Sequence, residues 1–504
     1  MYSTPTGPGV LCRPADLYSA RGRAGTAGPF PPGPRRVPMF SLSPQSSVPL
    51  VTQIVQGLRG LIEDGSMRAG TKVPSIRQFA QVHGVSVYTV VEAYDRLVAQ
   101  GFLVSRPHSG FFVRRRGRGG PADSVHPKDP GGATAFDALW YLRKIFENRH
   151  LSMKPGCGWL PDAWLFEDGL KRSLRALAGD DVGLGGYGDP KGYPQLRALM
   201  RDTLAEQEVA VVPEQVLLTQ GSSQALDLVA RRLVRPGDAV LVDDPGYANL
   251  LFSLRYLGAK LLGVPRTPGG YDLAALEALL AEHRPKVFFT QPRLHSPTGS
   301  VAPLSQLHRL LQLAERHDFT IVENDIYADL DPTPRPSLAG LDQLTRVVHI
   351  SSFSKTISPN LRVGYVVADP DLVEDLAQLK MIAGLTSSEF AERLVYGALT
   401  EGRWRKHLKG LRDRLAEAHE RVGARLDGLG FELFAEPKAG MFLWARHPAI
   451  ADAAELSDRA AEHDILLGPG HLFSPMLNAT PWMRFNVAYG EDDRVYAFLA
   501  AQRG

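Results

Sequence analysis

One stretch organises most of this chain: Val348-His-Ile-Ser-Ser-Phe-Ser-Lys355, followed by Thr-Ile-Ser-Pro-Asn-Leu-Arg362-Val-Gly364. An apolar, β-branched run ends in a serine-rich loop that carries one lysine, and an arginine follows seven residues after it. A lysine at the end of a buried strand packs poorly, because its ammonium must be solvated or paired. The same position suits an amine that is desolvated, lowered in pKa and used as a nucleophile on a carbonyl. The stretch alone is equally compatible with an exposed lysine in a polar loop.

Further short apolar runs surround this stretch and predict a sheet. Together with 347–350 they cover residues 216–218, 240–242, 260–264, 287–290, 320–322 and 363–367. Helical patterns separate them, for example at 226–233, 273–283 and 304–317. This alternation predicts a mostly parallel sheet covered by helices, which is an α/β architecture. Ligands of such sheets bind at the carboxyl ends of the strands.

Polar residues follow the predicted strands at that edge. Gly221-Ser222-Ser223 opens a helix after the first strand, where backbone N–H groups and the helix dipole would hold a phosphate. The residues that follow three further strands are a ring, a hydroxyl, a carboxylate and a phenol: Tyr247, Ser296, Asp325 and Tyr327. Each of these residues alone has an ordinary structural explanation. A phosphate site, an aromatic platform, a carboxylate and a lysine on one edge form the arrangement that pyridoxal phosphate needs.

Composition narrows the class of protein. The chain has 504 residues with 44% hydrophobic and 22% charged residues, which predicts two or three globular domains and a cytoplasmic protein. No apolar run approaches the length of a membrane span, and the two cysteines, Cys12 and Cys157, are too far apart in sequence to indicate a disulfide framework. The net charge of +3 is uneven, because residues 50–118 carry ten Lys or Arg and four Asp or Glu. A basic segment in front of an acidic remainder indicates a module that binds a polyanion, and charge alone is equally compatible with a solvated basic face.

The N-terminal region divides into an extension and a small domain. Residues 1–47 are rich in Pro, Gly, Arg and Ser and predict a disordered extension, and we expect translation to start at either Met1 or Met39. Residues 48–114 show helical patterns at 51–62, 74–80 and 87–100, followed by short strands at 102–104 and 111–113. Three helices and a hairpin with a polar tip predict a winged helix-turn-helix.

This domain resembles the GntR-type DNA-binding domain. The resemblance rests on Val73-Pro-Ser75-Ile-Arg77, on Gly84 through Gly101, and on Arg106-Pro-His108-Ser-Gly110. It implies that the following residues approach DNA: Ser75, Arg77, Ser86, Tyr88, Thr89, Arg106, His108 and Gly110. The family often has an arginine after the capping serine, whereas this chain has Val87. Tyr88 and the wing would then carry more of the base readout.

After a linker at 115–135, residues 136–504 resemble fold-type I aminotransferases that depend on pyridoxal phosphate, and the whole chain looks like the MocR branch of GntR regulators. The resemblance implies that Lys355 bonds covalently to the cofactor and that Asp325 pairs with its ring nitrogen. Tyr327 and Ser296 would lie at the ring oxygen, and Tyr247 would stack on the ring. The phosphate would be held by Ser222, Ser223, Ser352 and Arg362, with Tyr187 reaching across a family-type homodimer.

Two more features bear on activity. Arg484, in the apolar segment Trp482-Met-Arg484-Phe-Asn-Val, would bind the α-carboxylate of a substrate. The usual Asn-Pro-Thr-Gly motif reads Ser296-Pro-Thr-Gly299, and serine lacks the amide donor, so we expect cofactor binding to survive and the site to be less well tuned for transamination.

Three functions remain open at this point. The first is a transcription regulator that binds an operator and senses pyridoxal phosphate or an amino compound through Schiff-base chemistry. The second is a working aminotransferase with a regulatory or vestigial DNA-binding domain. The third, a DNA-binding protein with a cofactor-free scaffold, leaves the set Lys355, Asp325, Tyr327 and Arg484 unexplained.

Overall fold

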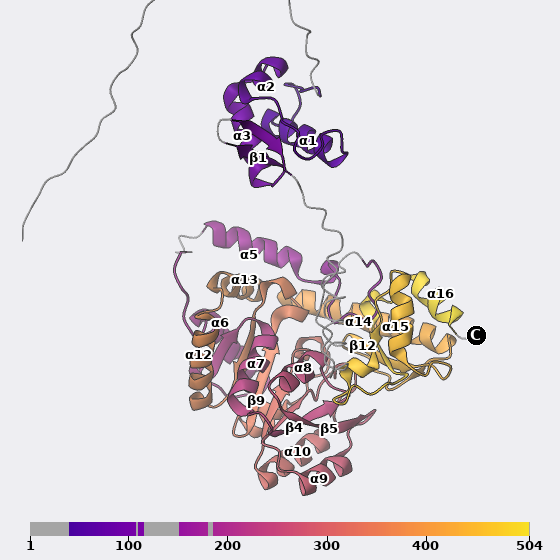
Figure 1. Cartoon of the computed structure of the whole chain (residues 1–504). Helices are drawn as coiled ribbons and strands as arrows, with labels where there is room; N and C mark the ends of the chain where they lie inside the picture. Colours follow the sequence, from indigo (N-terminus) through magenta and orange to yellow (C-terminus); the bar gives the residue numbers. More distant parts are fainter. Residues whose placement is uncertain (1–39, 107–108, 115–150, 180–184, 503–504) are drawn as a thin grey trace, which may run out of the picture. The chain divides into compact units, whose positions relative to one another are not determined.

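A computed structural model describes residues 40–106, 109–114, 151–179 and 185–502. The chain separates into two compact units, residues 1–128 and 129–504, and each is described by itself (Figure 1).

The first unit contains the predicted winged helix-turn-helix. Its elements are α1 (Leu50–Glu63), α2 (Ile76–His83), α3 (Val87–Ala99), β1 (Leu103–Arg106) and β2 (Gly110–Val113). Ser75 and Ser86 cap α2 and α3, because each hydroxyl accepts a hydrogen bond from a backbone N–H three residues later. Gly84 ends α2 in the left-handed conformation at φ 64° and so makes the tight turn into α3. β1 and β2 pair antiparallel, with Arg106 opposite Gly110.

The folded part of this unit begins earlier than expected. Residues up to 47 were expected to be a disordered extension, yet Phe40 and Leu42 pack against the core of the domain. The Phe40 ring lies 6.1 Å from that of Phe79 and 5.3 Å from that of His83. Gly57 on α1 leaves room for this ring, since a Cβ there would lie 2.5 Å from it. Two isolated apolar residues carry no period, so the sequence pattern could not reveal this contact.

An eight-stranded sheet forms the centre of the second unit. The strands are β3 (Val216–Thr219), β4 (Ala239–Asp244), β5 (Lys260–Thr267), β6 (Gly270–Tyr271), β7 (Val287–Thr290), β8 (Thr320–Asn324), β9 (Val347–Ser352) and β10 (Gly364–Val367). Their order is β3-β10-β9-β8-β7-β4-β5-β6. The pairs that link β5, β4, β7, β8 and β9 are parallel, whereas β10 runs antiparallel to both of its neighbours. The mostly parallel sheet predicted from the sequence is therefore confirmed.

Helices cover both faces of this sheet (Figure 1). Successive strand residues alternate between two apolar clusters, as the pleat requires: Leu218 belongs to one cluster and Leu217 to the other. The first cluster also contains residues of α6 (Pro194–Ala205), α9 (Leu273–Glu282), α10 (Leu304–His317) and α13 (Glu389–Thr400). The second contains residues of α7 (Gly221–Leu233), α8 (Ala248–Tyr256) and α12 (Pro370–Gly384). Both faces of the sheet are therefore buried.

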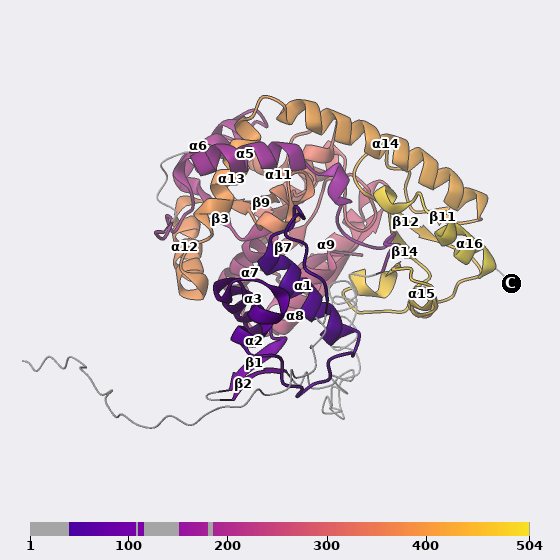
Figure 2. The same ribbon diagram turned by 90° about the horizontal axis from the view of Figure 1, so that it is seen from above.

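A smaller α+β part completes the unit. The long helix α14 (Trp404–Gly428) runs from the large sheet to this part, as Figure 2 shows. There it packs with α15 (Ala453–Glu462), α16 (Asp493–Ala501) and a second sheet of order β11-β12-β14-β13. The strands of this sheet are β11 (Glu432–Leu433), β12 (Phe442–Arg446), β13 (Gly468–Pro469) and β14 (Met483–Asn486). None of the described helices is both long and apolar enough to cross a membrane.

Candidate functional site

Lys355 ends a short 3-10 helix, η4 (Phe353–Lys355), directly after β9. Its Nζ donates a hydrogen bond to the carbonyl of Gly158 at 2.7 Å and lies 5.8 Å from the ring centroid of Tyr327. Burial and, after it, the nearby positive charge of Arg484 lower the pKa of this lysine to about 8, against the opposing effect of Cys157. Roughly one tenth of the side chain is therefore a free amine at pH 7, and the free amine is the form that attacks an aldehyde.

Asp325 follows β8 and is buried. Neither of its carboxylate oxygens has a hydrogen-bond partner within the part of the chain that the structure describes. Burial raises the pKa of the Asp325 carboxyl, and the Arg293 guanidinium, whose Nε lies 3.4 Å from Oδ1, opposes that rise. A buried carboxylate with unused acceptor sites costs free energy unless a ligand supplies the missing donor.

The predicted phosphate site is built by glycines as well as by donors. Gly221 begins α7 at φ 76°, and a Cβ there would collide with the guanidinium of Arg362. A Cβ on Gly364 would lie 2.7 Å from the backbone of Gly221 and Ser222. The guanidinium of Arg362 is exposed and donates at 3.2 Å to the carbonyl of Gln220, so it lies beside the N-terminus of α7. Backbone N–H groups, a helix dipole and a guanidinium thus converge on one spot, which suits a phosphate.

The serines of this site lie at different depths. Ser222 is partly buried, and Ser223 is exposed and forms a hydrogen bond with the Tyr247 phenol. Ser352 is buried and donates to the carbonyl of Val363 at 3.2 Å. Its hydroxyl also accepts from the backbone N–H of Ser354, so it orders the loop before Lys355 in addition to any contact with phosphate.

Tyr247 and Tyr327 provide the aromatic walls. Tyr247 precedes α8, and Asn249 Nδ2 donates to its phenolic oxygen at 3.2 Å. Tyr327 is buried and packs edge-on against Phe442, with ring centroids 5.8 Å apart. Burial raises the pKa of both phenols, so both remain protonated hydrogen-bond donors.

Ser296, which was predicted to lie at the ring oxygen of the cofactor, also contacts Arg484. Its Oγ accepts from Nη1 of Arg484 at 3.5 Å and also forms a hydrogen bond with the Tyr327 phenol. The residue therefore links the predicted cofactor wall to the predicted carboxylate site.

Arg484 lies in the middle of the smaller sheet, on β14 between β12 and β13, and is 6% exposed. Its guanidinium lies over the rings of Phe442 and Phe473, at 4.6 and 4.7 Å. Nη2 donates to the carbonyl of Gly156 at 2.8 Å, whereas Nε has no hydrogen-bond partner within the described ranges. A buried guanidinium with an unused donor is prepared to bind a carboxylate in a bidentate manner.

The sequence analysis missed one segment of this site. Residues 155–159, which we call the carbonyl loop, place the carbonyl of Gly158 on Lys355 and that of Gly156 on Arg484. Asn486 Nδ2 fixes the loop by donating to the carbonyls of Cys157 at 3.2 Å and Trp159 at 2.7 Å. The two glycines of Gly156-Cys-Gly158 were the only available signal, and backbone carbonyls leave no trace in sequence.

Tyr187 is 83% exposed. Its predicted place at the phosphate of a partner subunit stays a prediction.

Of the predicted DNA-binding residues that the structure describes, five are exposed and two are half-buried: Ser75, Arg77, Ser86, Tyr88 and Arg106, and Thr89 and Gly110. Arg77 is exposed on α2, and Tyr88 is 82% exposed at the start of α3. The hydroxyl groups of Thr89 and the capping Ser86 form a hydrogen bond of 2.7 Å. Arg106 lies over the Phe112 ring at 4.6 Å, Gly110 has φ 94°, and His108 lies outside the described residues.

The residues of the second unit fit pyridoxal phosphate. Two buried polar groups have no hydrogen-bond partner among the described residues: the Asp325 carboxylate, which can accept from a ring nitrogen, and Arg484 Nε, which can donate to a carboxylate. In addition, the turn at Gly221 leaves no room for a Cβ, so the backbone there is open to a phosphate. When bound, this cofactor supplies an aldehyde that condenses with amines and a ring that withdraws electrons. Lys355 would bind its aldehyde carbon, Asp325 its ring nitrogen, and Arg362 with the start of α7 its phosphate. Fold and site together define a class: a winged-helix DNA-binding domain joined to an aminotransferase-type domain with its cofactor site.

Comparisons with known proteins agree with this class. Residues 50–113 match the bacterial regulatory proteins of the gntR family, and residues 162–501 match aminotransferase class I and II. The chain is 31% identical to the HTH-type transcriptional regulator YdcR of Escherichia coli (strain K12), over 88% of this chain and 96% of that protein. It is 32% identical to the probable rhizopine catabolism regulatory protein MocR of Rhizobium meliloti, over 87% of this chain and 88% of that protein.

Among solved structures, LysN, the α-aminoadipate aminotransferase of Thermus thermophilus, matches with a TM-score of 0.66 and 29% identity. That match covers 73% of this chain and 96% of LysN, which is complexed with N-(5'-phosphopyridoxyl)-L-leucine.

The chain belongs to the GntR family of regulators, in its MocR branch, and its second unit belongs to the class I and II aminotransferase family. Its cofactor is pyridoxal 5'-phosphate.

Proposed function

We propose that this protein regulates transcription by binding operator DNA through residues 48–114 and by sensing pyridoxal phosphate, an amino acid or both through residues 136–504. The observation that carries the proposal is the complete ligand set, the half-buried Lys355 with the buried Asp325 and Arg484, on the same chain as a GntR-type domain. A scaffold without a ligand would not retain a buried carboxylate and a buried guanidinium with unused hydrogen-bonding atoms. A function on operator DNA places the protein in the cytoplasm.

The effector class follows from the charges of the site. Arg484 would bind a carboxylate, and an amine would condense with the cofactor where Lys355 attaches, so the effector that fits is an amino acid. For the effector to act, it must bind one conformation of the protein more tightly than another. We propose that this conformational change occurs in a homodimer, in which the exposed Tyr187 would reach the partner's phosphate site.

Footprinting tests this function. The promoter next to the gene is footprinted with the full chain, with and without pyridoxal phosphate and with a panel of amino acids. A footprint that changes with the cofactor in the wild type but not in Lys355→Ala supports the proposal, whereas a footprint indifferent to every ligand contradicts it. Many turnovers with an amino donor and a keto acceptor would instead support the alternative, an aminotransferase whose DNA-binding domain is secondary.

A further inference from the structure

Arg293 is a charged residue of the cofactor site that the sequence analysis did not assign. It lies in the loop after β7, and its Nε is 3.4 Å from Oδ1 of Asp325. Its side chain is 11% exposed, so water screens this ion pair weakly. The buried partner of the ring nitrogen thus already has a cation beside it.

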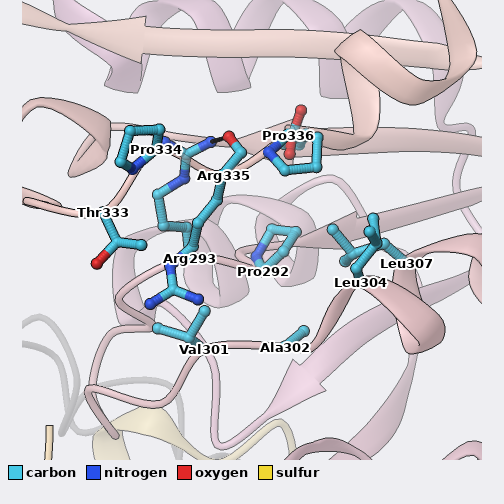
Figure 3. Close-up of a pocket in the computed structure, with 11 residues that line it drawn as sticks. Pro292, Arg293, Val301, Ala302, Leu304, Leu307, Thr333, Pro334, Arg335 and Pro336 are labelled. Atoms are coloured by element: carbon cyan, nitrogen blue, oxygen red, sulfur yellow. Dashed lines mark hydrogen bonds between the residues drawn. The ribbon is translucent and has the colours of Figure 1, made fainter. Parts of the chain in front are cut away.

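The surroundings of Arg293 hold it in this place. Its Nη2 donates to the carbonyl of Arg335 at 3.1 Å, as Figure 3 shows. It borders a cavity of about 230 Å³ whose walls include Pro292, Pro334 and Pro336 (Figure 3). The ion pair with Asp325 and the hydrogen bond to Arg335 thus engage two different nitrogens of the guanidinium. The contact is therefore a built part of the site.

The other charges around Asp325 do not replace Arg293. Glu323, Asp329 and Asp331 are acids and disfavour the carboxylate anion. His349 favours the anion, but its Nδ1 faces Glu323 at 3.2 Å, and Glu323 also accepts from the backbone N–H groups of Leu338 and Ala339. Arg293 is the first of the charged groups that act on Asp325 in order of strength.

We propose that Arg293 shares the Asp325 carboxylate with the ring nitrogen of pyridoxal phosphate and so weakens the hold of that nitrogen on its proton. This inference rests on the proposed function, because it assumes that the cofactor binds. A cation that already neutralises much of the carboxylate charge leaves less of it for a second cation, and the two cations repel each other. The pyridine ring with a weakly held proton is a poorer electron acceptor.

The consequence separates two kinds of chemistry. Amino-group transfer needs the ring to accept electrons when a C–H bond next to the nitrogen breaks. Condensation of an amine with the aldehyde, in which the C–N double bond forms and water leaves, does not. Arg293 therefore favours reversible capture of an amino compound over its conversion, which is what a sensor needs.

The test uses the full chain loaded with pyridoxal phosphate that is isotopically labelled at the ring nitrogen, whose NMR chemical shift reports its protonation against pH. Arg293→Gln and Arg293→Met remove the charge, and Arg293→Lys keeps it. We expect the ring nitrogen of the neutral variants to lose its proton about one pH unit or more higher than in the wild type, with Arg293→Lys close to the wild type. Transfer of an amino group to the cofactor in a single turnover should be about tenfold faster in the neutral variants.

Two results would overturn the proposal: a ring nitrogen in the wild type that stays protonated throughout the accessible pH range, or neutral variants that titrate as the wild type does. The first needs no variant, so poor folding of a variant does not remove the test. If the wild type does not take up the cofactor at all, the proposed function fails instead, and the two failures are thus distinguishable.

Discussion

The pH dependence of cofactor attachment tests the environment of Lys355. Burial and the charge of Arg484 lower the pKa of this lysine to about 8, from an ordinary value of about 10.5. Only the free amine attacks an aldehyde. At pH 7 roughly one tenth of the side chain is free, against roughly three in ten thousand at the ordinary value, so attachment should be about 300-fold faster than for a solvated lysine.

Stopped-flow absorbance of the pyridoxal phosphate chromophore measures the rate. Because the folded pKa lies below the ordinary one, the rate should rise about tenfold per pH unit at low pH and level off above about 8. Cys157, whose pKa burial raises to about 11, does not titrate in this window. Arg484→Met should move the midpoint upward, because it removes a nearby positive charge. Arg446→Met, on an exposed side chain of β12, is the matched control and should leave the midpoint unchanged. A rate that still climbs steeply between pH 9 and 10 would show that the pKa of Lys355 is not lowered by its surroundings.

Three further predictions concern other parts of the chain. Lys380 is 1% exposed and donates to two backbone carbonyls and one hydroxyl at 2.8 Å, so Lys380→Met should lower the free energy of unfolding in urea by about 3 kcal/mol. Lys409→Met, which removes an exposed ion pair, should change it by less than about 1 kcal/mol, and equal effects would show that the bonds of Lys380 do not matter. Gly364→Ala should raise the dissociation constant for pyridoxal phosphate roughly tenfold or more, because its Cβ would lie 2.7 Å from the backbone of the phosphate site. Gly384→Ala, which has open space around it, is the control and should leave this constant unchanged in binding titrations. Val87 is 50% exposed at the start of α3, so replacing operator thymines by uracil should weaken DNA binding in gel shifts about fourfold per methyl contacted, and Val87→Arg should abolish that sensitivity; unchanged affinity with uracil would refute apolar readout.

Much of the fold could be predicted because each strand of the large sheet is a short apolar run between helical patterns. The strand ends then placed Lys355 and Asp325 on one edge, since the strands that carry them, β9 and β8, are parallel neighbours. Arg484 could be singled out because an arginine inside an apolar strand needs a partner.

The rest depended on contacts between segments far apart in the chain. In the sequence, Arg293 is not distinguishable from an ordinary loop residue. Only the packing of the loop after β7 brings it close to Asp325, which follows β8. The carbonyl loop lies nearly 200 residues before Lys355 and acts through backbone atoms that every sequence possesses. Packing of Phe40 on the first domain rests on two apolar residues in a stretch without period.

The carbonyl loop has a consequence for the energetics of sensing. The backbone oxygens of Gly156 and Gly158 already accept one hydrogen bond each from Arg484 and Lys355, the two cations that an amino acid and the cofactor would engage, so incoming ligands compete in part with the protein's own chain. In sequence, the loop begins a few residues after the segment 115–150, which connects it to the DNA-binding domain. Any restraint that DNA binding transmits along the chain to this loop changes ligand affinity, and ligands that release the loop change DNA affinity by the same factor. If the loop responded to DNA binding in this way, the effector concentration needed for binding would depend on operator occupancy.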